Sequence, residues 1–176
     1  MAEFDSFDRF TILALFALLL GMPALSQSEL ANTGSPIPSM NSLGTVVGGY
    51  DVVAYIDYGE ATEGDPQYYV DHENTYRFRF ASKVTMKKFM GDPDRYMPAF
   101  GGYCALSLGV EPGEVPGLNP GLHRAEPKIF KVIDGRVHLF SSENALERWN
   151  ENEEAYRARA ESNWDAILEA RKKSSP

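Results

Sequence analysis

An alternation of aromatic and charged residues stands out near the middle of the chain. Over residues 75–80 the sequence TYRFRF places an aromatic side chain at every second position, which is the period of a strand with one buried and one solvated face. The polar pair Glu73-Asn74 separates this run from residues 67–72. The pattern predicts a β-hairpin over residues 67–80.

A second hairpin is predicted over residues 128–140. Asp134-Gly135 lies between two apolar-rich runs, and Asp-Gly is a strong turn signal for a hairpin. In the second run His138 alternates with Val137 and Leu139. We therefore expect the His138 side chain to face solvent, on the side of its strand away from the core.

A short helix is predicted between the two hairpins. Ser82 is a favourable N-cap, and Met86, Phe89 and Met90 follow it at helical spacing, so we expect these three side chains in the core. Asp92-Pro93 then begins a further helical turn, with Asp as its cap and Pro at its first position.

The last part of the chain predicts helices. Ser141 or Ser142 caps a helix with Leu146 and Trp149 on one face. From residue 151 onward a second helix begins with acidic and ends with basic residues, which complements the helix dipole. Its apolar positions are Tyr156, Ala160, Trp164, Ile167 and Leu168. Together these elements predict the α+β class: a small single domain with two β-hairpins, a short central helix and C-terminal helices.

Residues 109–127 predict a long, stiffened loop. Pro-Gly recurs at 112–113, 116–117 and 120–121. Pro followed by Gly suits the two central positions of a type II turn, so we expect a turn at each of these places.

Composition and charge narrow the range of functions. The chain has 176 residues, of which 43% are hydrophobic, and this is enough for one globular core. Its formal net charge of −8 repels the phosphates of nucleic acids, so we expect no nucleic-acid partner.

The N-terminus is typical of an export signal. Residues 10–20 are an apolar run too short to span a bilayer, and small residues follow at 24–26. We expect a signal peptide over 1–26, a flexible leader over 27–45, the folded domain over 46–170 and a tail over 171–176. The protein is then exported, to the periplasm or the extracellular space. Acidic residues before the apolar run leave open an uncleaved membrane anchor or a misassigned start; otherwise no transmembrane span is expected.

Cys104 is the single cysteine of this chain, so no internal disulfide can form. Three interpretations are open: a buried and inert side chain, a metal ligand, or a redox thiol.

Four stretches resemble the exported branch of the YHS domain family. They are residues 49–55 (GYDVVAY), 76–82, 89–96 and above all 100–105 (FGGYCA). The resemblance covers residues 46–164 and implies a small α+β module of a type proposed to bind heavy metals. The chain has Ala54, Ala81 and Thr85 where that family places thiols, and Pro112 where the exported branch places a histidine.

A metal site would need donors besides Cys104, because one thiolate is not a site. The candidates are Cys104, His123 and Met97, and the ion would be copper or zinc; the cofactor is otherwise unknown. A solvated loop residue is the alternative for His123, and a surface role is expected for His72.

The motifs also suggest a small-ligand pocket. Its candidate residues are Tyr50, Asp51, Tyr55, Tyr96, Gly101, Gly102 and Tyr103. The alternative is structural, with Asp51 capping a turn, the tyrosines packing in the core and the glycines turning the chain.

No catalytic motif is present in the sequence, and we name no catalytic residue. The expected function is that of an exported accessory module that binds a metal ion or a small ligand, with an exported or membrane protein as a further partner. The alternatives are a redox protein that uses Cys104 and a non-catalytic interaction module with a buried cysteine.

Overall fold

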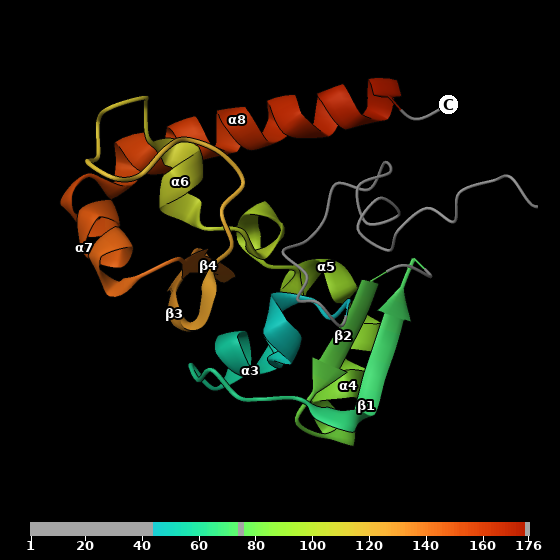
Figure 1. Ribbon diagram of the computed structural model, residues 1–176. Coiled ribbons are helices and arrows are strands. Elements are labelled where there is room, and N and C mark those ends of the chain that lie inside the picture. The colour runs from blue at the N-terminus through green and yellow to red at the C-terminus, as the bar shows by residue number, and fades with distance from the viewer. Residues whose placement is uncertain (1–43, 74–75, 175–176) are drawn as a thin grey trace, which may run out of the picture. The chain divides into compact units, whose positions relative to one another are not determined.

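The computed structural model describes residues 44–73 and 76–174. Within these ranges the chain forms two antiparallel hairpins of two strands each, together with helices (Figure 1). The expected α+β class is therefore confirmed. The predicted signal peptide, residues 1–26, and the predicted leader up to residue 43 lie outside the described residues.

The elements alternate between helices and hairpins along the chain. The first are η1 (Val47–Gly49), α3 (Val52–Asp57), β1 (Asp65–His72), β2 (Tyr76–Phe80), α4 (Lys83–Gly91) and α5 (Pro93–Tyr96). They are followed by η2 (Ala99–Gly102), α6 (Ala105–Gly109), β3 (Glu126–Ile133), β4 (Arg136–Phe140), α7 (Glu143–Glu151) and α8 (Glu153–Ser174).

The hairpin β1–β2 packs its aromatic face inward, as predicted. Tyr76, Phe78 and Phe80 are each at most 1% exposed, and Phe89 of α4 lies on them, with its ring centroid 4.7 Å from that of Phe78. These rings form the first of two apolar clusters, together with residues of α3 and of β4.

The helix α4 begins where Ser82 predicts it, but one of its expected core residues is exposed. The Ser82 hydroxyl accepts a hydrogen bond from the Thr85 N–H, and the Thr85 hydroxyl accepts one from the Ser82 N–H. Thr85 and Phe89 are buried, whereas Met90 is 60% exposed. The prediction for Met90 was wrong because the buried face centres on positions 85 and 89, and Met90 lies about 100° further around the helix.

The hairpin β3–β4 is closed by Asp134-Gly135, as predicted. Both residues have positive φ, 50° and 75°, which is the conformation of the two-residue turn that matches the twist of the strands. Val132 pairs with Val137 across the ladder.

The strand β4 is buried on both faces, and here the prediction for His138 was wrong. His138 is only 5% exposed. Val137 and Leu139 belong to the first apolar cluster, whereas Phe140 belongs to the second, which contains Trp149 of α7. Because Phe100 of η2 and Trp149 of α7 pack against His138 on the face that was expected to meet water, successive residues of β4 face the two clusters in turn.

The second cluster is completed by α6, α7 and α8. Ser142 caps α7, and Trp149 is fully buried. The sequence analysis assigned no element to residues 105–108 and placed Gly109 in the loop, whereas the structure forms α6 there. Asn163 of α8 donates a hydrogen bond from Nδ2 to the Leu108 carbonyl at 2.8 Å, which ties the two helices together. Within the described ranges, no helix is both long and apolar enough to cross a membrane.

Two of the three expected Pro-Gly turns are present in the loop after α6. The N–H of Glu114 donates to the Glu111 carbonyl, and the N–H of Leu118 donates to the Val115 carbonyl, both at 3.1 Å. At the third place the expectation was wrong: Gly121 has a φ of 138°, far from the value of about 80° that a type II turn requires, and its N–H donates to the Ser107 carbonyl at 2.8 Å. A tertiary hydrogen bond to α6 therefore holds Gly121 in a conformation that a type II turn does not have.

Gly109 is the point of closest approach between α6 and α8. A Cβ atom at this position would lie 2.4 Å from the Tyr156 carbonyl oxygen. Since that oxygen is backbone, the two helices would have to separate. We predict that Gly109→Ala lowers the free energy of unfolding by at least about 2 kcal/mol, as measured by urea denaturation.

The matched control for this prediction is Gly91→Ala at the end of α4, where no atom lies within 4 Å of the added carbon. This variant should be neutral, or more stable by up to about 1 kcal/mol, because Ala favours a helix more than Gly does. Equal stabilities of the two variants would contradict the close helix contact.

Candidate functional site

Cys104 lies inside the second apolar cluster. Its side chain is 0% exposed, and its backbone forms an isolated parallel bridge with Leu139 of β4. Its N–H donates to the His123 carbonyl at 2.9 Å. The residue therefore joins the start of α6 both to β4 and to the Pro-Gly loop.

The three predicted metal donors are not gathered in one place. The loop brings the backbone of His123 beside Cys104, as its hydrogen bond shows. Met97 instead lines a pocket that includes neither of the other two. Among the described residues, no group of three or more His, Cys, Asp and Glu side chains is placed to hold a metal ion.

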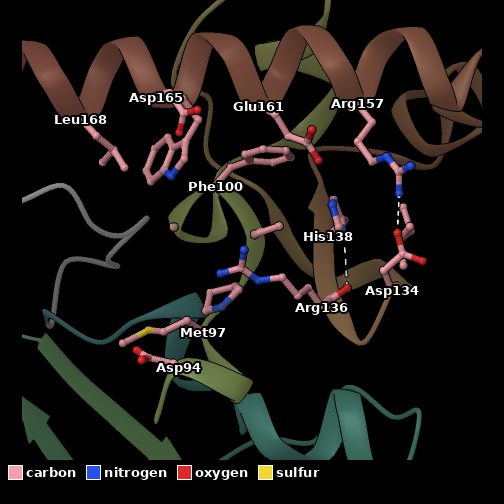
Figure 2. A pocket seen from close by; sticks show the side chains of 15 residues that line it. Asp94, Met97, Phe100, Asp134, Arg136, His138, Arg157, Glu161, Asp165 and Leu168 are labelled. Carbon is pink, nitrogen blue, oxygen red and sulfur yellow. Dashed lines mark hydrogen bonds and ion pairs between the residues drawn. The ribbon is translucent and has the colours of Figure 1, made fainter.

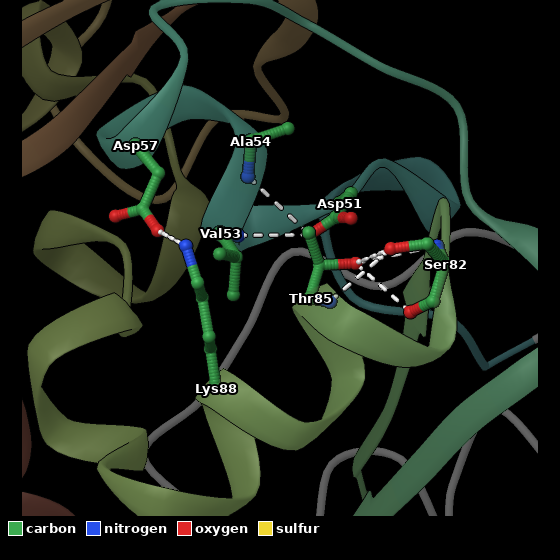
Figure 3. Close-up of polar contacts among 7 residues, drawn as sticks. All are labelled: Asp51, Val53, Ala54, Asp57, Ser82, Thr85 and Lys88. Atoms are coloured by element: carbon green, nitrogen blue, oxygen red, sulfur yellow. Dashed lines mark hydrogen bonds and ion pairs between the residues drawn. The ribbon is translucent and has the colours of Figure 1, made fainter.

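Asp51 caps α3, which is the structural alternative given above (Figure 3). One carboxylate oxygen accepts the Val53 N–H at 2.9 Å and, more weakly, the Ala54 N–H at 3.4 Å. The other oxygen accepts the Ala81 N–H at 2.8 Å. The fully buried carboxylate thus connects α3 to the segment between β2 and α4.

The tyrosines of the predicted pocket make structural contacts. The Tyr55 hydroxyl donates to the Pro127 carbonyl at 2.7 Å, and burial raises the pKa of Tyr55. The Tyr50 hydroxyl donates to Glu63 at 3.2 Å, and Tyr96 is buried in the first cluster. None of these three side chains is part of the pocket that Met97 lines.

The turn before Cys104 is a run of left-handed residues. Phe100, Gly101 and Gly102 have φ values of 53°, 59° and 81°. Glycine adopts such values freely, but a residue with a Cβ atom pays about 1–2 kcal/mol. Phe100 is held there with its ring 5.5 Å from the His138 ring and 6.4 Å from the Trp164 ring. The strained turn therefore directs this ring toward β4 and α8.

A pocket of about 530 Å³ lies between the Met97–Gly101 segment, the turn of hairpin β3–β4 and α8. Figure 2 shows side chains of α8 pointing down into it and those of the hairpin approaching from the opposite side. Its aromatic lining is Phe100, His138 and Trp164. Of the residues predicted to form a ligand pocket, Gly101 alone lines this one. Tyr103 lies nearby, with its ring centroid 6.4 Å from that of Trp164, but is not part of the lining.

His138 presents a neutral ring to this pocket. The Arg136 carbonyl lies 3.1 Å from Nδ1; since a carbonyl can only accept, Nδ1 bears the proton. Burial lowers the pKa of His138, and the charges of Arg136 and Arg157 lower it further, while the carbonyl hydrogen bond and Glu153 oppose them. Nε2 is therefore left as a hydrogen-bond acceptor.

Two ion pairs hold α8 against the hairpin. Arg157 of α8 bonds Asp134 in the hairpin turn at 2.7 Å, and Lys131 of β3 bonds Glu153 at 2.6 Å. Both pairs are partly exposed, so each contributes little to stability. Their geometric effect is to fix one end of the pocket, because Asp134 and Arg157 both line it.

Sequence reasoning missed this pocket. Its three rings come from η2, β4 and α8, and no local spacing relates them. The helical pattern correctly predicted that Trp164 lies on the apolar side of its helix. Phe100 entered the sequence analysis only as the first residue of the FGGYCA motif. Comparison of the chain with protein-family models, with curated proteins and with solved structures found no match.

The neutral His138 gives a pH-dependent stability. In the unfolded chain a histidine has a pKa of about 6.5. Because the pKa is lower in the fold, the unfolded state gains a proton first as the pH falls, and stability is lost below about pH 6.5. We predict that His138→Gln reduces the loss of unfolding free energy between about pH 7 and pH 5. Equal losses in the two proteins, measured by urea denaturation, would contradict this prediction.

The buried thiol gives a second prediction. We expect iodoacetamide to alkylate Cys104 only as fast as the protein unfolds, because the side chain is 0% exposed. The control is Met90→Cys in a Cys104→Ser background, since Met90 is 60% exposed and a thiol there should react in the native state. Mass spectrometry of both proteins, with and without urea, measures the rates; rapid native labelling of Cys104 would contradict its burial.

Proposed function

We propose that this chain is an exported accessory module of the YHS type that binds a small organic ligand. The observation that supports this proposal is the pocket of about 530 Å³ between η2, the hairpin β3–β4 and α8. Typical small-molecule sites have volumes of about 300–1,000 Å³ and combine aromatic walls with a few polar groups. The export and the partner protein that we propose depend on the sequence resemblance and on residues 1–26.

The pocket offers both an apolar surface and a polar anchor. The Phe100 and Trp164 rings meet at 73°, so a planar or aliphatic ligand can lie against one face while contacting the edge of the other. His138, which lines the same pocket from the hairpin, offers its Nε2 atom as a hydrogen-bond acceptor. Rings supply most of the binding free energy in such sites, and the polar group sets the orientation of the ligand.

Binding at Cys104 has less support than binding in the pocket. A metal ion or an oxidant could reach the thiol only by displacing side chains of the second cluster, because Cys104 is fully buried. The metal and redox functions expected for this residue therefore need an opened state of the domain, whereas the pocket is open in the structure.

The test is a fragment screen followed by NMR with the wild-type protein and Trp164→Ala. We predict that bound fragments shift the NMR signals of the pocket residues. We also predict that Trp164→Ala lowers the affinity for these fragments at least about tenfold. Tyr58→Ala is the control, since Tyr58 is an aromatic residue 55% exposed outside the pocket. Unchanged affinity in Trp164→Ala, in a protein that still melts cooperatively, would contradict the proposal.

A further inference from the structure

The walls of the pocket carry an excess of negative charge. Asp134 and Arg157 neutralise one another at 2.7 Å. The remaining charged residues of the lining are Asp94, Glu161, Asp165 and Arg136. In the part of the chain that the structure describes, none of these four side chains has a salt-bridge or hydrogen-bond partner. Three carboxylates thus face one guanidinium, which leaves a formal excess of two negative charges.

Two of these carboxylates stand together on α8. Glu161 and Asp165 are four residues apart, so they project from the same face of the helix, and both line the pocket. Figure 2 shows both descending from α8, on either side of the Phe100 ring in that view. Like charges at this spacing weaken a helix unless a cation lies between them.

Two other acidic residues of the same helix are paired. Glu153 bonds Lys131 at 2.6 Å, and Glu169 bonds Lys172 at 2.9 Å. Glu161 and Asp165 differ from these two residues, because they line the pocket, are exposed to solvent, and have no ion-pair partner among the described residues. A ligand with positive charge would supply the missing partner.

The aromatic lining favours the same kind of ligand. Trp164 lies between Glu161 and Asp165 in the chain and is half-buried in the pocket wall. The face of an indole ring attracts cations, more strongly than any other aromatic side chain does. The nearby His138 Nε2 atom can accept a hydrogen bond from an N–H of the ligand. Arg136 reaches in from the hairpin, on the other side of the Phe100 ring from Asp165 in Figure 2.

We propose that the ligand is an organic cation, an amine whose ammonium group lies between Glu161 and Asp165 on the Trp164 face, with its apolar part on Phe100. This inference rests on the proposed ligand-binding function of the same pocket. Carboxylates and an indole face recognise an ammonium group, and the volume of the pocket accommodates the apolar body of the amine.

The test compares three probes of similar shape and different charge: 2-phenylethylamine, 2-phenylethanol and 3-phenylpropionate. Each is titrated into isotope-labelled protein while the indole N–H signal of Trp164 is followed. The amine should bind at least about tenfold more tightly than the alcohol and the acid, from the combined cation–π and carboxylate contacts. Glu161→Gln/Asp165→Asn should reduce this preference to about twofold or less.

The matched control is Glu154→Gln/Glu169→Gln, which removes two carboxylates from the same helix outside the pocket and should keep the full preference. Binding of the alcohol or the acid as tight as that of the amine would overturn the charge preference but leave the proposed function intact. A preference that survives Glu161→Gln/Asp165→Asn would also overturn it. If none of the three probes shifts the Trp164 signal, the proposed function fails together with the inference.

Discussion

The burial of β4 on both faces is the constraint on which the rest of the structure depends. Val137 and Leu139 close the cluster of hairpin β1–β2, and Phe140 belongs to the cluster of α6, α7 and α8. A five-residue strand thus connects two apolar clusters that are formed by separate parts of the chain. It also brings a histidine into the interior, because His138 lies on the face that Phe100 of η2 and Trp149 of α7 cover.

The pocket is a consequence of this arrangement. The same face of β4 that holds Phe140 presents His138, whose Nδ1–H is satisfied by the Arg136 carbonyl. The ring of Phe100 reaches it through a left-handed turn that costs about 1–2 kcal/mol, and burial of the ring, worth about 1.5–3 kcal/mol, offsets that cost. Because α8 is fixed by the approach of Gly109 and by Asp134–Arg157, its side chains cover a cavity and do not collapse into it.

Local signals in the sequence predicted the helices and hairpins, but not the contacts between distant elements that form the second apolar cluster. Ser82, Ser142 and Asp134-Gly135 act through neighbours in the chain, and each was identified correctly together with the alternation in β2. The prediction for His138 was wrong because its burial depends on Phe100 of η2 and Trp149 of α7, and the alternation of residues along one strand carries no information about such distant elements. The predicted turn at Pro120-Gly121 was wrong for the same reason. The Gly121 N–H donates to the Ser107 carbonyl, which belongs to α6, a helix too short for its periodicity to be recognised. The candidate site could be predicted only for Gly101 and Met97, because its rings come from three distant elements.

The most direct test of this account is the ¹⁵N NMR spectrum of the His138 ring at neutral pH, without any ligand. Two-sided burial of β4 predicts a neutral ring with its proton fixed on Nδ1, where the Arg136 carbonyl accepts it, and with Nε2 unprotonated. A protonated ring, or the mixture of tautomers that a solvated histidine shows, would contradict it. In that case the covered face of β4, and the pocket built on it, would not exist in solution as described.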